Sequence, residues 1–245
     1  MKAAERTAGT GRTTAALELV CFPPAGGSAA AFRRWQAALG PDITVRAIDR
    51  RGDGAARIHG TSLTGIAASL APLVARRTPY ALVGHSLGGL LAYETALRIC
   101  GRPELPRPRF VLVAGARPPH RSSAAVFAPL LELADDDLLD ALAELGAVNP
   151  VLRTTPLKGL FLPALRADLA LIAGYHPDPG APPLPVDLLA WHAEDDALAT
   201  PALGREWRRY TAARFEHTAF PGGHFFLQER FADVAAALRT RCAAG

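Results

Sequence analysis

A tight turn in the first half of the chain constrains the fold more than any other sequence feature. The apolar residues 80–83 predict a strand, Gly84-His85-Ser86-Leu87-Gly88 follows at once, and a helical pattern then continues to Ile99. Glycines at both ends of this motif let a strand and a helix approach closely, while the serine between them is held on a strained turn. The hydroxyl of such a serine projects over the end of the sheet, at a helix N-terminus. The motif therefore predicts that Ser86 is a catalytic nucleophile.

Short apolar runs alternate with helical patterns on both sides of that turn. This alternation is typical of an α/β fold, in which helices flank a mainly parallel sheet. The strands that it predicts span residues 17–22, 43–48, 80–83, 110–114, 186–191 and 214–220. The helices that it predicts span residues 28–39, beginning at Ser28, and then 62–75, 86–99 and 226–239. A chain of 245 residues that is 49% hydrophobic suits one such domain with a large buried core.

Residues 122–175 interrupt this alternation with consecutive helical patterns. Helices are expected at 135–145, with Asp135 as the N-cap, and at about 157–172. Helices inserted between the strands of such a sheet are most simply a lid. We therefore expect an α/β core of residues 15–121 and 176–245, a helical lid of residues 122–175, and a flexible tail of residues 1–14.

A serine hydroxyl needs a general base, and in α/β-hydrolases the chain order is serine, then acid, then histidine. His224 follows the last expected strand, in a loop whose Gly222 and Gly223 let the backbone turn sharply. No other histidine has this placement, so His224 is the predicted base. His85 neighbours the nucleophile and is expected to line the pocket.

The acid of such a site should follow the strand predicted at 186–191. Glu194, Asp195 and Asp196 all do so. We expect Asp196 to bond the far nitrogen of the histidine, because it lies where the chain turns toward a helix at Pro201. Asp195 is the second candidate and Glu194 the third.

The tetrahedral intermediate of acyl transfer needs N–H donors for its oxyanion. One donor is the backbone N–H of Leu87, the residue after the nucleophile. The second should come from the loop Phe22-Pro23-Pro24-Ala25-Gly26-Gly27. Since proline has no N–H, this donor is Ala25 or Gly26.

Composition argues against several other classes of protein. The net charge of +4 comes almost wholly from scattered arginines, which form a solvated surface or a face for an acidic protein partner, and no nucleic-acid-binding motif accompanies them. No metal-ligand cluster, GxGxxG or P-loop is found, so no metal or cofactor is expected. Neither a membrane span nor a signal peptide is expected. The cysteines, Cys21, Cys100 and Cys242, include no CxxC pair, so we expect a cytoplasmic protein.

Several motifs together resemble the type II thioesterases of polyketide and nonribosomal peptide synthesis. These motifs are Phe22-Pro23-Pro24-Ala25-Gly26-Gly27, Gly84-His85-Ser86-Leu87-Gly88-Gly89, Phe161-Leu162-Pro163 with Arg166-Ala167-Asp168, Asp195-Asp196, and Gly222-Gly223-His224-Phe225-Phe226-Leu227. The family consists of editing hydrolases of the α/β-hydrolase fold that remove stalled acyl groups from carrier domains. The resemblance covers about residues 19–231.

Carried over to this chain, the resemblance makes Ser86 the nucleophile, Asp196 the acid and His224 the base. It makes Ala25 and Leu87 the oxyanion donors, and it makes residues 122–175 a mobile helical lid. It implies acyl or peptidyl carrier domains as partners and no cofactor beyond the phosphopantetheine that carries the substrate. Where the family tends to have Pro-Gly-Arg-Gly, this chain has Asp49-Arg50-Arg51-Gly52-Asp53, a loop expected to shape the mouth of the acyl pocket.

Other functions remain open on the same residues. A small-molecule carboxylesterase or lipase would use the same fold and site, but its activity would not depend on a carrier domain. A non-catalytic or chain-releasing partner of a synthase is a third hypothesis. A releasing enzyme would transfer the acyl group to an internal hydroxyl rather than to water.

Overall fold

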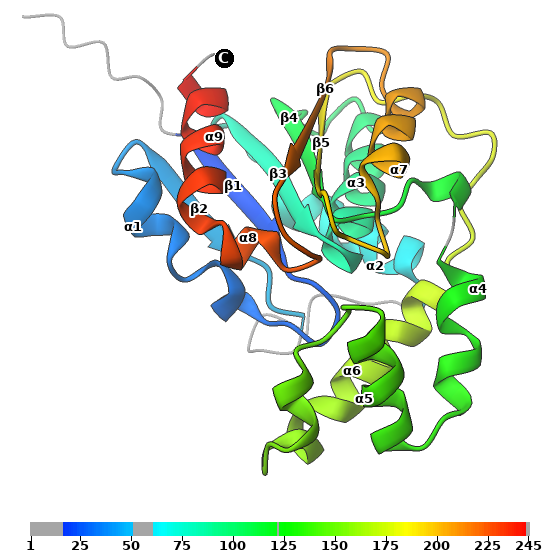
Figure 1. Cartoon of the computed structure of the whole chain (residues 1–245). Coiled ribbons are helices and arrows are strands. Elements are labelled where there is room, and N and C mark those ends of the chain that lie inside the picture. Colours follow the sequence, from blue (N-terminus) through cyan, green and yellow to red (C-terminus); the bar gives the residue numbers. More distant parts are fainter. Residues whose placement is uncertain (1–16, 51–60, 122, 244–245) are drawn as a thin grey trace, which may run out of the picture.

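The structure, a computed structural model, describes residues 17–50, 61–121 and 123–243. The expected tail, residues 1–14, and the Arg51-Gly52-Asp53 part of the expected pocket loop lie outside these ranges. The strands form one fully parallel sheet in the order β2-β1-β3-β4-β5-β6, as Figure 1 shows. They are β1 (Leu17–Phe22), β2 (Ile43–Ala47), β3 (Tyr80–His85), β4 (Phe110–Ala114), β5 (Asp187–Ala193) and β6 (Phe215–Phe220).

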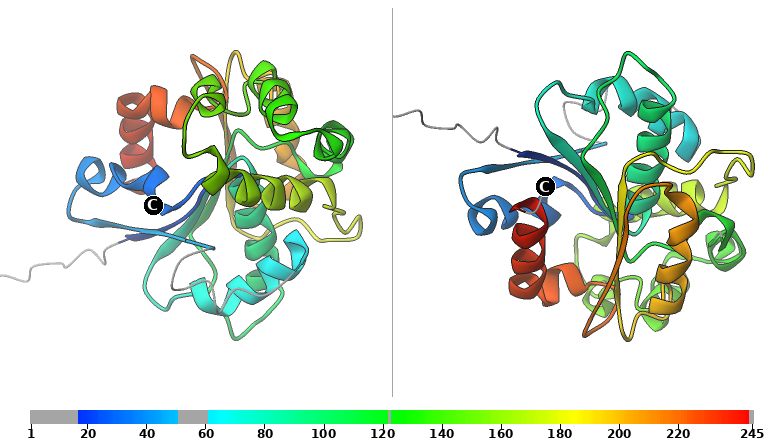
Figure 2. Two further views of the ribbon diagram at one scale, coloured as in Figure 1. Left: turned by 90° about the horizontal axis from the view of Figure 1, so that it is seen from below. Right: turned by 90° about the horizontal axis from the view of Figure 1, so that it is seen from above.

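Helices cover both faces of the sheet (Figure 2). Because side chains alternate between the faces of a strand, β1 places Val20 and Phe22 in one buried cluster and Leu19 and Cys21 in another. The first cluster lies under α2 (Leu63–Val74), α3 (Leu87–Cys100) and the segment of α7 (Pro201–Glu206) and η6 (Trp207–Tyr210). The second lies under α1 (Trp35–Leu39) and α9 (Phe231–Ala243). The expected α/β fold with a parallel sheet is confirmed.

The chain between β4 and β5 is helical and contains no strand among its described residues. It begins with η3 (Pro119–Arg121), which lies beside α7 and η6. The helices that follow lie together beyond one end of the sheet (Figure 1), and they are α4 (Ala124–Phe127), η4 (Pro129–Glu132), α5 (Asp135–Glu144), η5 (Pro150–Arg153) and α6 (Lys158–Ala173). We call residues 123–175 the insertion.

The helix expected over residues 28–39 is two shorter elements. Ser28 caps a 3₁₀ helix, η1 (Ala29–Phe32), and α1 begins only at Trp35. The break lets Phe32 and Trp35 both turn inward, where their rings meet edge to face at 5.2 Å. Gln36 then exchanges hydrogen bonds with the backbone of β2, through the carbonyl of Ile43 and the N–H of Val45. Tertiary contacts therefore override a local sequence that favours one continuous helix.

Two further boundaries differ from expectation. Asp135 is not the N-cap of α5, because Ala134 holds that position, and Asp135 lies in the first turn. There its negative charge interacts favourably with the positive end of the helix dipole, and its carboxylate pairs with Arg166 of α6. The helix expected over residues 226–239 divides at Arg230 into α8 (Phe226–Glu229) and α9.

Candidate active site

Ser86 occupies a strained turn between β3 and α3. Its φ of 55° is the only positive value at a non-glycine position among the described residues. A Cβ atom on Gly84 would lie 1.9 Å from the carbonyl oxygen of Gly88, and one on Gly88 would lie 2.1 Å from that of Phe22. The N–H of Ser86 donates to the carbonyl of Ala114 at 2.8 Å. The two glycines are thus required by close backbone contacts, which hold the serine at the end of the sheet.

His224 and Asp196 form a buried pair. The Nδ1 atom of His224 lies 2.8 Å from Oδ2 of Asp196, and the other carboxylate oxygen accepts from the N–H groups of Leu198 at 2.9 Å and Ala199 at 3.0 Å. Burial raises the pKa of the Asp196 carboxyl, but the hydrogen bond and charge of His224 and the two N–H donors outweigh it. The net effect is to lower this pKa. An ionised Asp196 holds the proton of His224 on Nδ1 and leaves Nε2 as an acceptor.

The structure brings Asp196 to the histidine and leaves the two other candidate acids outside. Glu194 and Asp195 are exposed, whereas Asp196 is buried. Their backbones have a different role, since the N–H of Glu194 donates to Phe220 and that of Asp195 to Gly222. These bonds fasten the loop after β5 to the loop after β6. They therefore set Asp196 and His224 side by side.

Ser86 and His224 line the same narrow hollow at the carboxyl ends of the strands. It consists of two adjoining cavities of about 20 Å³ each, room for little more than one water molecule. Ala25 lines one cavity and Leu87 the other. The insertion supplies a largely apolar wall of this hollow, formed by Ser123, Phe127, Leu142, Ala147, Val148, Leu165, Leu169 and Ile172.

The hydrogen bonds of the loop after β1 indicate which of its N–H groups can bind an oxyanion. The N–H of Gly26 donates to Oδ2 of Asp168, in α6, at 2.8 Å, and the N–H of Gly27 donates to Pro24. Both are therefore already used, whereas Ala25 faces the cavity that Ser86 lines. Leu87 is the first residue of α3, where N–H groups have no partner within the helix. This geometry favours Ala25 over Gly26.

His85 does not line the pocket, contrary to expectation. It is fully buried behind the site, and its Nε2 atom lies 2.8 Å from the carbonyl oxygen of His224. Because a carbonyl only accepts, Nε2 must carry the proton and donate. Burial, and then the nearby His224, lower the pKa of His85 to about 3. A neutral His85 therefore anchors the backbone of the loop that carries the base.

His192 was not singled out by the sequence, and it supports the same region from β5. It is buried, and its Nε2 atom donates to the carbonyl of Ala116 at 3.0 Å, as does the indole N–H of Trp207 at 2.8 Å. Ala116 lines the hollow beside Ser86. No local sequence signal marks this role, because it depends on a contact between residues 76 positions apart.

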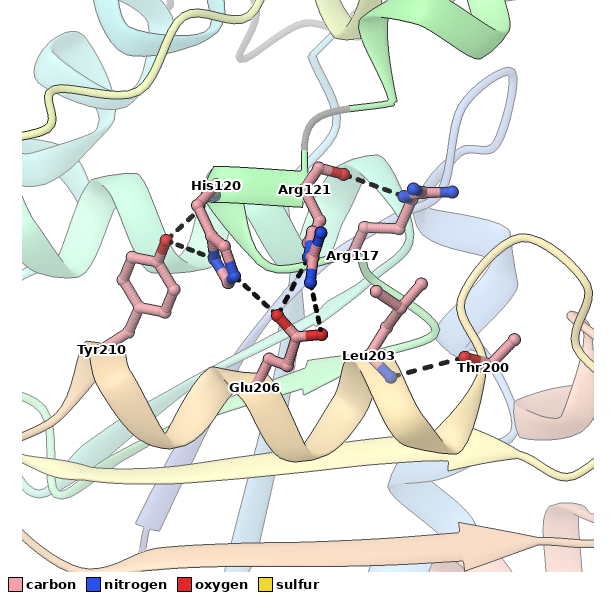
Figure 3. A network of polar contacts seen from close by, with 7 residues as sticks. All are labelled: Arg117, His120, Arg121, Thr200, Leu203, Glu206 and Tyr210. Carbon is pink, nitrogen blue, oxygen red and sulfur yellow. Dashed lines mark hydrogen bonds and ion pairs between the residues drawn. The ribbon is translucent and has the colours of Figure 1, made fainter.

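A polar network at the rim fastens the start of the insertion to the core (Figure 3). Glu206 accepts from Arg121 and contacts the Nε2 atom of His120, whose backbone N–H donates to the Tyr210 hydroxyl. The hydrogen bonds of Arg121 and His120 lower the pKa of Glu206. Arg117 adds donations to the carbonyls of Arg121 and Leu198. The network thus links η3, which directly precedes the insertion, to α7 and η6.

The sheet and the turn at Ser86 define the α/β-hydrolase fold. A family model for the thioesterase domain matches residues 17–242, so the chain belongs to the thioesterase family.

Two curated relatives illustrate this membership. The chain is 34% identical to the AMB antimetabolite synthetase AmbE of Pseudomonas aeruginosa, over 93% of the chain but only 11% of that protein. It is also 34% identical to a probable cadicidin biosynthesis thioesterase of Streptomyces griseus, over 87% of the chain and 59% of that protein. The chain therefore spans less than two thirds of the length of either relative.

Solved structures of similar length agree. The RedJ thioesterase from the prodiginine biosynthetic pathway of Streptomyces coelicolor is 34% identical, with a TM-score of 0.78 over 93% of this chain and 91% of that one. The type II thioesterase BorB from the borrelidin biosynthetic cluster is 30% identical, with a TM-score of 0.78 over 92% of each chain. The resemblance to type II thioesterases is confirmed.

The described part of the chain has neither a candidate metal site nor a candidate membrane span. No group of three or more histidine, cysteine, aspartate or glutamate side chains there is arranged to hold a metal ion. No helix within the same ranges is both long and apolar enough to cross a membrane.

Proposed function

We propose that this thioesterase edits a polyketide or nonribosomal peptide synthase, by hydrolysing stalled acyl groups from the phosphopantetheine of acyl or peptidyl carrier domains. The proposal rests on the geometry of the site together with the family of the chain. His224, bonded to the buried Asp196, lines the same hollow as Ser86, and the chain is a thioesterase by family. The solved relatives RedJ and BorB belong to biosynthetic pathways, which supports the substrate class. The free cysteines support a cytoplasmic location.

The chemistry needs only side chains and backbone of this chain. Ser86 attacks the thioester carbonyl while Nε2 of His224 takes its proton, and ionised Asp196 stabilises the imidazolium. The N–H groups of Ala25 and Leu87 hold the oxyanion. His224 then protonates the departing thiol, whose pKa of about 8.5 makes it a better leaving group than an alcohol. Water activated by His224 releases the free acid and restores Ser86. No step requires a metal or cofactor.

Residues 122–175 act as a lid in this proposal. The insertion supplies an apolar wall of the hollow, and that hollow is too small to hold an acyl chain. A substrate therefore needs the wall to move outward before it can reach Ser86. Closure of the lid afterwards would exclude bulk water from the acyl-enzyme.

The test compares one acyl group on a carrier domain and on a free pantetheine thiol. We expect a higher kcat/KM on the carrier domain. The excess should fall as salt rises, because the arginine surplus steers an often acidic partner and salt screens that attraction. Free acid is the expected product. Equal kcat/KM on both substrates would reject carrier recognition and favour a carboxylesterase or lipase, whereas a cyclic product would favour chain release.

A further inference from the structure

The insertion places a buried carboxylate against the oxyanion loop, residues 22–27. Asp168 in α6 accepts from the N–H of Gly26 at 2.8 Å through Oδ2, and its Oδ1 pairs with Nη2 of Arg50 at 2.7 Å. The side chains of Asp168 and Arg50 are only 4% and 8% exposed. Three segments far apart in sequence thus meet at one carboxylate. The side chains of Asp168 and Arg50 have no role in the mechanism proposed above.

The loop is packed as well as bonded against this face of α6. Gly26 has a φ of 68°, and a Cβ atom there would lie 3.1 Å from Cδ1 of Leu165. Leu165 and Asp168 are three residues apart, so they lie on the same side of the helix. Gly26 therefore sits against α6 with little space to spare, and its N–H direction is fixed by an ionic acceptor.

That direction decides what the loop offers to the substrate. Pro23 and Pro24 have no N–H, and Gly27 donates to Pro24, so Ala25 and Gly26 are the remaining donors of the turn. Because Asp168 takes the N–H of Gly26, the peptide between Ala25 and Gly26 is held in one orientation. Rotation about the neighbouring bonds, which would swing the N–H of Ala25, is restrained as a result.

We propose that Asp168 is a positioning residue, which holds the oxyanion loop so that the N–H of Ala25 meets the oxygen of an acyl group on Ser86. Arg50 balances its charge and orients its carboxylate. The inference rests on the proposed function only in requiring acyl chemistry at Ser86.

The contact also couples the insertion to the chemistry. Arg166, on the same helix, donates to Asp135 and to the carbonyl of Leu133, so α6 carries η4 and α5 with it. A movement of the insertion that displaces α6 removes the acceptor of Gly26. The oxyanion loop therefore has its catalytic geometry only while α6 is in place, which links enclosure of the acyl group to its hydrolysis.

Two double variants separate positioning from plain stability. In Arg50→Gln/Asp168→Asn the amide oxygen can still accept from Gly26, whereas in Arg50→Met/Asp168→Leu no acceptor remains. Replacing a buried ion pair by apolar side chains of similar size commonly preserves stability, so the second variant is expected to fold. Thermal unfolding checks this for both.

We expect Arg50→Met/Asp168→Leu to lower kcat by about 100-fold, the scale of losing one oxyanion donor, with KM within about twofold. The amide variant should recover kcat to within about tenfold of wild type. Lys158→Gln is the matched control, because it breaks an exposed ion pair of the same helix, with Asp136, without touching the loop. It should leave kcat unchanged.

A second readout is the affinity for an alkyl boronic acid, which adds to a serine oxygen and places a boronate oxygen in the oxyanion site. Its affinity should fall with kcat in the apolar variant and recover in the amide variant. A folded apolar variant with wild-type kcat and boronate affinity would overturn the proposal, as would an equal loss in Lys158→Gln. Boronate binding without thioesterase turnover by the wild type would instead refute the proposed function and leave the positioning role measurable.

Discussion

The core and the insertion build opposite walls of the same hollow in different ways. On the core side, Ser86, Asp196 and His224 each sit in a loop directly after a strand. Backbone hydrogen bonds join the loops of Asp196 and His224, and the side chain of His85, next to Ser86, donates to the carbonyl of His224. On the insertion side the wall is made of helix faces, with side chains such as Phe127, Leu142 and Ile172.

The two walls also differ in what holds them in place. The ion pairs within the insertion include Arg153 with Asp140 and Lys158 with Asp136, whose side chains are 39–58% exposed. Such exposed pairs contribute little to stability, because solvent and salt screen the attraction between the charges. The large apolar side chains most exposed among the described residues, Val151, Leu157 and Leu160, lie on the insertion too. The core wall is therefore suited to fixed chemistry and the insertion wall to movement and selection, and Asp168 is one of the points where the two are joined.

The largest expected effect is in the core wall. Asp196→Asn should lower kcat by about 10⁴-fold, because an amide in place of the carboxylate favours the wrong tautomer of His224. Asp195→Asn is the matched control, and it should change kcat little because the Asp195 side chain is exposed. Steady-state kinetics on one acyl thioester measures both. A severe loss in Asp195→Asn with a mild one in Asp196→Asn would move the acid and contradict the geometry of this wall.

A change in the insertion wall should act on selection rather than on the chemical step. Phe127 is buried and borders both cavities, so Phe127→Ala widens the hollow. We expect kcat/KM for long or branched acyl groups to rise by about tenfold relative to short ones, a typical worth of one methylene in an apolar pocket. Leu160→Ala, on the exposed part of α6, should leave the ratio unchanged. An unaltered ratio in Phe127→Ala would show that this wall does not contact the acyl chain.

The smallest expected effect concerns the place where the insertion rejoins the core. Glu94 of α3 is buried, and although Tyr175 donates to it at 2.7 Å and Arg98 lies near, burial dominates and raises its pKa. Because the folded state disfavours the ionised carboxyl, Glu94 lowers the free energy of unfolding once the pH exceeds about 4.5, the pKa of this group in the unfolded chain. This loss of stability is complete when the pH lies above the pKa of Glu94 in the folded protein. Glu94→Gln keeps an acceptor for Tyr175 without the charge.

We expect Glu94→Gln to raise the free energy of unfolding by about 1 kcal/mol at pH 8, with the gain shrinking as the pH falls toward 4.5. Unfolding by urea across this pH range measures the difference from wild type. A variant less stable than wild type at every pH would mean that the pair with Arg98 outweighs the burial of the charge.

Sequence reasoning located the core wall well because its residues obey local rules. Each catalytic candidate follows an apolar strand, and the order of serine, acid and histidine selected His224 from the histidines of the chain. Close backbone contacts around Ser86 leave room only for glycine at positions 84 and 88, so this turn can be recognised in the sequence as a motif.

Contacts over long sequence distances were not predictable in the same way. The choice between Ala25 and Gly26 depends on Asp168, which is 142 residues from Gly26. The burial of His85 depends on the carbonyl of His224, 139 residues away, so the pocket role expected for it was wrong. The break between η1 and α1 likewise depends on packing and on contacts with β2. A single sequence contains no local record of such partners.

In the proposed mechanism, Ser86 carries the acyl group during thioester hydrolysis. The most direct test is to mix the protein with an acyl pantetheine thioester, quench with acid within one turnover, and locate the added acyl mass by mass spectrometry of its peptides. We expect the acyl group on the peptide that contains Ser86, with no adduct and almost no turnover in a folded Ser86→Ala variant. An acyl group on another residue, or a folded Ser86→Ala variant that keeps most of its activity, would contradict it.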